Sequence, residues 1–240
     1  MARAILAAVS LISAALLLPA SAAETIGAAT EAKNEVTGTL DELERAIKTG
    51  DGVSANEVLK TGNGSAAVIT FLDDTSLNVG ASSTIVLDRF VYDPEGNADD
   101  AVLNLTRGAF RFVTGKSDPS KFEIRTQVAT LGIRGTDFVV ICDGINRCGV
   151  VVATGIVKIC PRPDLPIDCD VSFQLDRVKN AAIIGPDGEN TGAESVPPGL
   201  VQGIIAALAR GEDLSVTLIA LGLDQGAPIR SIQPRNASPG

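Results

Sequence analysis

The feature that most constrains this chain is a long series of short, β-favouring runs separated by turn residues, from Val53 to Ile184. Valine, isoleucine, threonine and phenylalanine dominate the runs, whereas glycine, asparagine, aspartate and serine separate them. This pattern predicts strands joined by tight connections, and no helical periodicity of useful length interrupts it. The expected strands are 34–40, 58–61, 66–72, 75–79, 84–92, 102–105, 108–113, 122–126, 136–142, 148–153, 156–160, 171–175 and 181–184.

The regular spacing of these strands predicts an all-β domain over residues 34–184, built as a β-sandwich, a roll or a short solenoid. Residues 24–32 are small and polar, and we expect them to be a disordered lead-in. Residues 41–48 are rich in charge, and we expect a polar strand connection there, or at most a short helical turn.

The composition changes after the last expected strand. Glycine, proline and polar residues over 185–198 indicate a linker. Apolar residues then recur at helical spacing, two prolines precede them and Gly211 follows, which predicts a helical hairpin over 199–225 and a flexible tail over 226–240. We expect the apolar stripe of the hairpin to pack on its own domain; the alternative is a surface for a partner.

The N-terminus has the three parts of a secretory signal peptide, predicted over residues 1–23. Arg3 supplies the basic part, residues 4–18 are apolar, and small residues suit cleavage after Ala22 or Ala23. The apolar run is about 15 residues, shorter than the roughly 20 that a spanning helix needs. We therefore expect an exported protein, periplasmic or secreted, with no membrane span in the mature chain.

Composition narrows the function classes. The chain has 29 acidic and 20 basic residues, a net charge of −9, which argues against nucleic acid as a partner. It has no histidine, so the usual general base and the commonest metal ligand are both missing. No nucleophile–base pair, metal set or cofactor motif is present, so we expect no catalytic residues, no cofactor and no metal, and hence not an enzyme.

An acidic stretch over 93–104 spaces its oxygens like the start of a calcium loop. Ala98 stands where an EF-hand has its glycine, and Asn104 where it has its bidentate glutamate. A solvated acidic loop is the preferred interpretation, and a weak calcium site is the alternative.

The chain has four cysteines, Cys142, Cys148, Cys160 and Cys169. An even, clustered set in an exported protein indicates disulfides, and the spacing lacks the short paired knuckle of a zinc site. Residues that flank a hairpin loop lie at bridging distance. We therefore favour local pairing, Cys142 with Cys148 and Cys160 with Cys169, which would clip loops.

Several short motifs follow one another along the β-rich region, at 61–62, 71–75, 87–90, 105–115, 124–126 and 129–138. Over residues 56–140 this chain resembles the FecR domain family, and the block 129–138 is the most specific part. The resemblance implies a periplasmic β-rich module. Its namesake type sits on an inner-membrane regulator and relays the signal of an outer-membrane iron-uptake transporter to a sigma factor.

We expect neither a cytoplasmic sigma-binding segment nor a membrane anchor, so only the role of an interaction or sensing module is expected to carry over. We predict a non-catalytic, regulatory or signal-transducing module that binds an unknown envelope protein. The alternative is a structural or adhesive envelope protein that associates with itself, so a homo-oligomer stays open.

The family signature consists of residues that are either structural or partner-binding: Asp73, Thr75, Gly108, Thr126, Gly132, Arg134, Gly135 and Thr136. Glycine permits a bulge or a positive φ, so Gly132 and Gly135 are expected to re-aim a strand. Arg134 has a planar guanidinium that can bind a carboxylate. We hypothesise that it is a structural clamp inside the domain, with Asp73, Asp74, Asp88 and Asp137 as candidate partners; the alternative is an exposed arginine that binds an anion or a partner.

Overall fold

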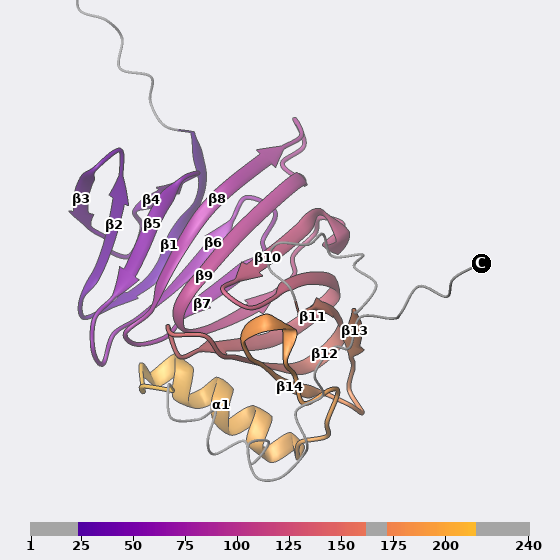
Figure 1. Ribbon diagram of the computed structural model, residues 1–240. Helices are drawn as coiled ribbons and strands as arrows, with labels where there is room; N and C mark the ends of the chain where they lie inside the picture. Colours follow the sequence, from indigo (N-terminus) through magenta and orange to yellow (C-terminus); the bar gives the residue numbers. More distant parts are fainter. Residues whose placement is uncertain (1–23, 162–171, 215–240) are drawn as a thin grey trace, which may run out of the picture.

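The computed structural model describes residues 24–161 and 172–214 (Figure 1). Over these ranges fourteen strands form one sheet and a single α-helix follows them, so the all-β prediction is confirmed. The strands are β1 (Thr25–Lys33), β2 (Val36–Leu40), β3 (Leu43–Ala46), β4 (Gly52–Ser54), β5 (Glu57–Thr61), β6 (Ala66–Phe71), β7 (Ser76–Val79), β8 (Thr84–Tyr92), β9 (Ala98–Val113), β10 (Phe122–Thr126), β11 (Thr130–Cys142), β12 (Cys148–Cys160), β13 (Phe173–Leu175) and β14 (Ala181–Ile184). The helix is α1 (Pro198–Arg210).

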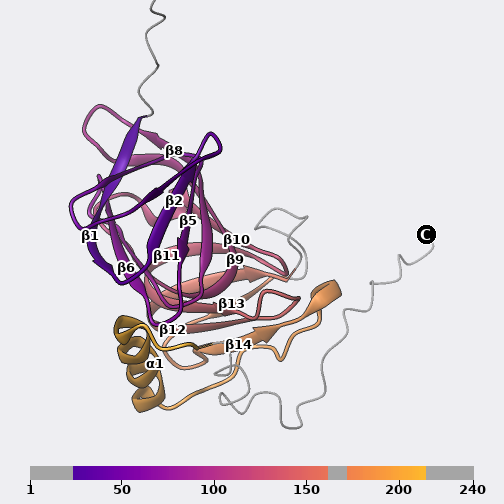
Figure 2. The same cartoon turned by 90° about the vertical axis from the view of Figure 1, so that its left-hand side faces the viewer.

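The sheet rolls over on itself because its longest strands change neighbours along their length (Figure 2). The first half of β9 pairs with β8 and, in parallel, with β10, whereas its second half pairs with β7 and β11. The inner faces therefore meet across one apolar core. Phe71 of β6 stacks on Phe90 of β8 with ring centroids 4.8 Å apart, which joins the two sides of the roll.

Glycines bend the three longest strands without ending them. Gly108 in β9, Gly135 in β11 and Gly155 in β12 have φ of +103°, +57° and +83°, a region that favours glycine. The sequence predicted two shorter strands within β9, 102–105 and 108–113, and two within β12, 148–153 and 156–160. The structure shows continuous strands, since a positive-φ glycine re-aims the chain while its neighbours keep pairing.

The disordered lead-in expected over 24–32 is wrong, because β1 lies there and pairs with β4 and β6. Ile26 and Ala29 are buried in the core. A β-carbon at Gly27 would lie 2.5 Å from the carbonyl oxygen of Thr70. The small residues of β1 have a low strand propensity, but their size permits the close packing of β1 on β6.

The connection expected over 41–48 is a hairpin, with β3 paired to β2. Asp41 and Glu42 form its turn at φ of +48° and +66°. No helical turn is present at this position among the described residues. All residues of β3 are exposed at the edge of the sheet, so its charged composition did not indicate a strand.

Helix α1 packs on the outside of the roll, against β9, β11, β12 and β14 (Figures 1 and 2). Val201, Ile204 and Leu208 are buried in this second apolar cluster, so the first helix of the predicted hairpin packs on its own domain, as expected. Gly211 ends the helix in the left-handed conformation, again as the sequence predicts. The Nζ of Lys33 donates to the carbonyl of Arg210 over 2.7 Å, at the negative end of the helix dipole.

The predicted linker, 185–198, folds back on the sheet. Isolated bridges join Ala181 to Glu194 and Ile184 to Asn190. The predicted signal peptide, most of the second helix, the tail and Cys169 lie outside the described residues. Within the part of the chain that the structure describes, no helix is long and apolar enough to cross a membrane.

Candidate functional site

Two signature residues, Asp73 and Thr75, hold the turn between β6 and β7. The buried carboxylate of Asp73 accepts hydrogen bonds from the amide of Thr75 at 3.1 Å and from its hydroxyl at 2.7 Å. The hydroxyl of Thr75 in turn accepts the amide of Gly115 at 3.0 Å. Asp74 takes the positive φ of +64° at the apex and pairs with Lys116 at 2.5 Å. These residues build a turn and dock the end of β9 on it.

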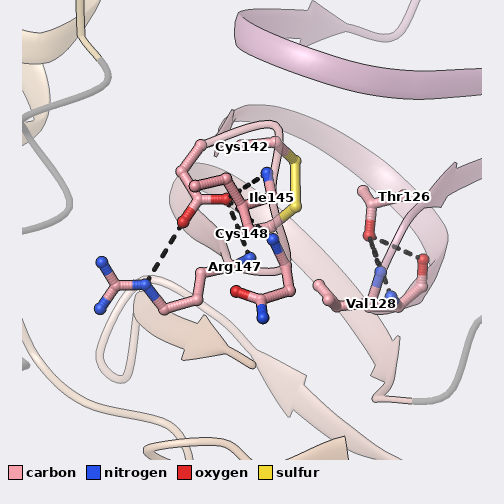
Figure 3. The surroundings of a disulfide bond; sticks show 9 residues. Thr126, Val128, Cys142, Ile145, Arg147 and Cys148 are labelled. Atoms are coloured by element: carbon pink, nitrogen blue, oxygen red, sulfur yellow. Dashed lines mark hydrogen bonds and ion pairs between the residues drawn. A yellow bond between two sulfur atoms is a disulfide. The ribbon is translucent and has the colours of Figure 1, made fainter. Parts of the chain in front are cut away.

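Gly108 and Thr126 are also structural. A side chain at Gly108 would overlap Ser83, whose hydroxyl accepts the amide of Ala109 at 3.2 Å. Thr126 lies in the turn between β10 and β11 (Figure 3). Its hydroxyl accepts the amides of Val128 and Ala129 at 3.2 and 2.9 Å.

The predicted bridge between Cys142 and Cys148 is confirmed, with Cα atoms 4.1 Å apart at the ends of β11 and β12 (Figure 3). Asp143 orders the loop that the bridge closes. Burial alone would raise the pKa of Asp143, but hydrogen bonds from the amides of Ile145, Arg147 and Asn146 outweigh it and lower that pKa. Cys160 is disulfide-bonded, and its expected partner Cys169 lies outside the described residues.

The clamp hypothesis for Arg134 is wrong. Arg134 is exposed, and its side chain makes no hydrogen bond or ion pair with the described residues. Each candidate carboxylate has another partner: Asp73 binds Thr75, Asp74 binds Lys116, Asp88 binds Asn104 and Asp137 binds Arg111. Arg134 is exposed, as the alternative expects, and its binding of an anion or a partner stays a prediction.

Arg111 and Asp137 make the clamp that the sequence assigned to Arg134. Two hydrogen bonds of 2.8 and 2.7 Å join the guanidinium in β9 to the carboxylate in β11. This bidentate pairing raises the pKa of Arg111. Asp137 thereby fixes the strand immediately after the bend at Gly135.

The two bends in β11 and β12 lie against each other. A β-carbon on Gly155 would overlap the carbonyl oxygen of Gly135 and lie 2.8 Å from Cγ2 of Thr136. The register of the pair shifts between Arg134 and Asp137, which is the bulge expected at Gly135. Gly132, by contrast, has no positive φ and pairs regularly with Glu123 and Lys158.

This double bend opens a cleft, here called the arginine cleft, with a volume of about 510 Å³. Its lining residues come from β11, from the bend in β12 and from the turn between β13 and β14: Arg134, Thr154, Gly155, Ile156, Asp176, Arg177 and Val178. Arg134 also lines a second hollow of about 260 Å³, which includes Gly132 and Lys158. Arg134 is therefore shared by two concave surfaces.

Charge in the arginine cleft is unbalanced toward the positive. Arg177 is exposed and, like Arg134, makes no hydrogen bond or ion pair within the described ranges. The carboxylate of Asp176 accepts the amides of Lys179 and Val178 at 2.9 and 2.7 Å; these hydrogen bonds and, to a smaller extent, the charges of Arg177 and Lys179 lower its pKa. Val178 is 73% exposed at the rim. The cleft thus presents two arginines and an apolar side chain to solvent.

The sequence alone predicts no functional role for Gly155, Arg177 or Val178. The signal for Gly155 was present, because the glycine interrupts a Val/Ile-rich run between two expected half-strands. The turn 176–179 follows an expected strand and begins with aspartate, which is typical of such turns. Neither feature shows that these residues meet Arg134, since the turn lies more than 40 residues away from it in the chain.

The acidic stretch over 93–104 is a loop only as far as Asn97, because β9 begins at Ala98, and the carboxylates of its aspartates have partners within the chain. Asp93 accepts the amide and side chain of Asn97 at 2.8 and 2.9 Å, and these hydrogen bonds lower its pKa. Asp99 pairs with Lys121, and Asp100 with Arg89. In the described part of the chain, no group of three or more histidine, cysteine, aspartate or glutamate residues is placed to hold a metal ion.

Residues 57–158, which span β5 to most of β12 and include Arg134, match the FecR protein family. The chain carries a FecR domain. The FecR domain thus contains every bend glycine described above, whereas the turn 176–179 and α1 lie beyond the match.

Two crystal structures of a candidate anti-sigma factor from Parabacteroides distasonis ATCC 8503 are similar to this chain. Each is 19% identical, and the TM-scores are 0.45 and 0.43. The similarity covers 63% of this chain and 64% and 63% of those chains, less than two thirds of their length. No curated protein matches the chain.

Proposed function

We propose that this chain is an exported, non-catalytic FecR-domain module that binds a protein partner in a regulatory or signal-transducing system of the bacterial envelope. The FecR match over 57–158 supports the regulatory role. The expected signal peptide and the bridge between Cys142 and Cys148 support an oxidising location outside the cytoplasm.

One observation carries the proposal: the exposed position of Arg134. Signature residues such as Asp73, Thr126 and Gly135 turn, bend or pin strands, whereas Arg134 contributes no contact of that kind among the described residues. An exposed arginine beside a concave surface is typical of protein interfaces, where arginine is enriched. The domain therefore presents this residue to a partner.

Crosslinking in intact cells through a C-terminal tag tests the proposal. We expect wild type to capture one defined envelope protein at fixed stoichiometry, and Arg134→Glu to lose it. Lys60→Glu is the matched control, because Lys60 is also exposed but lies in β5, outside the cleft. Crosslinks only between copies of the chain, or to bulk envelope material, would refute the signalling role and favour a structural or adhesive protein.

A further inference from the structure

We infer that the arginine cleft is the docking site of an acidic peptide segment of the partner, one that combines carboxylates with an apolar side chain. This inference rests on the proposed function and specifies its surface and its partner chemistry. Two arginines, an apolar rim and a preformed concave floor carry it.

The first argument is charge. Arg134 and Arg177 both line the cleft, and neither makes a hydrogen bond or an ion pair with a carboxylate of the described residues. The one carboxylate in the lining, Asp176, accepts two backbone amides of its own turn. A guanidinium fork binds carboxylates through paired hydrogen bonds, so the chemistry that completes this cleft is a carboxylate.

The second argument is contrast with the rest of the molecule. The chain has a net charge of −9, so an acidic segment is repelled by most of the surface and attracted at a local positive site. Such an arrangement restricts where an acidic segment docks and fixes its orientation. A surface that only needed to stay soluble would not require unpaired arginines in a hollow.

The third argument is shape. Val178 is 73% exposed, and the half-buried Ile156 also lines the cleft. Arginine is enriched among the residues that dominate binding energy, and the contacts around such residues exclude water from them. The bends at Gly135 and Gly155 are part of two paired strands, so the floor exists before a partner arrives and little ordering is required on binding.

The test uses a synthetic peptide, Asp-Glu-Leu-Asp-Glu-Leu with blocked ends, titrated into the nitrogen-15-labelled mature protein. Its neutral isostere, Asn-Gln-Leu-Asn-Gln-Leu, is the matched ligand control. We expect the acidic peptide to shift the amide signals of 134, 154–156 and 176–178, and the isostere to shift none. Arg134→Glu and Arg177→Glu should each weaken binding about tenfold or more, while Lys60→Glu should not.

The inference is overturned if the acidic peptide shifts no signals, shifts signals elsewhere, or binds the Arg134→Glu variant as well as wild type. Vesicles of phosphatidylglycerol test the other source of anionic groups. If vesicles bind wild type in a way that Arg134→Glu abolishes, while the peptide does not bind, the cleft recognises a membrane surface and the inference is wrong. If the peptide fails but tagged wild type still captures one envelope protein in cells, the proposed function stands and only the cleft assignment falls.

Discussion

Alanine at Gly155 is the sharpest test of the double bend. The substitution places a non-glycine residue at φ of +83°, where the left-handed region costs about 1–2 kcal/mol. Its β-carbon would also overlap the carbonyl oxygen of Gly135, and overpacking of this kind costs about 1–3 kcal/mol. The lower entropy of the unfolded alanine chain offsets about 0.4–1 kcal/mol. We therefore expect the free energy of unfolding to fall by about 2–4 kcal/mol.

Gly135→Ala is the matched control. Gly135 has a similar φ of +57°, but no atom lies within 4 Å of the position that its β-carbon would take. Only the backbone strain applies, so we expect a loss of about 1 kcal/mol.

Urea unfolding followed by far-ultraviolet circular dichroism measures both variants, and the chain has no tryptophan to follow instead. In thermal unfolding the losses correspond to about 5–15 °C for Gly155→Ala and about 2–4 °C for Gly135→Ala. Equal losses for the two variants would refute the close contact between the bends, and no loss at Gly155 would refute the bend itself.

Three further predictions concern stability. Thr136→Val should raise the free energy of unfolding by about 1 kcal/mol in urea unfolding, because the buried Oγ1 of Thr136 has no hydrogen-bond partner among the described residues; a loss would show that the hydroxyl is paired. Replacing Cys142 and Cys148 together by serine should lower it by about 2 kcal/mol, and an unchanged urea midpoint would show that the bridge adds nothing. The lowered pKa of Asp143 adds stability above its unfolded pKa of 3.8, and this stability is lost as the pH falls through the lower pKa of the folded state. Since the chain has no histidine, the melting temperature should be flat from about pH 5 to 8 and should fall below about pH 4. A change of the melting temperature near pH 6 would contradict this prediction.

The sequence predicted most of the strands because their apolar residues are β-branched and turn residues bound them. It misplaced strand ends where glycine bends a strand, as at Gly108 and Gly155. Local composition shows an interruption there, but whether pairing continues across it depends on the neighbouring strands. It also missed β1, whose alanines and glycine are weak strand formers and gain stability only from close packing on β6.

The site was less predictable than the fold. The guanidinium of Arg134 and several aspartates in the sequence suggested a clamp at Arg134. Asp137, one of those aspartates, instead pairs with Arg111 of β9. Cross-strand pairing of this kind depends on register, which one sequence does not reveal. The arginine cleft joins the bend at Gly155 to the later turn that carries Arg177, and only the folded chain brings them together.

The family signature divides into two kinds of residue once the structure is known. Asp73, Thr75 and Gly135 have contacts or backbone angles that explain them as parts of turns and bends. Arg134 is placed by those bends but supports none of them, since its side chain is exposed and unpaired among the described residues. A residue that the scaffold positions and does not use for its own stability is available for binding. In the docking that we propose, the bends at Gly135 and Gly155 hold Arg134 at the edge of the hollow, where a carboxylate of the partner would reach it.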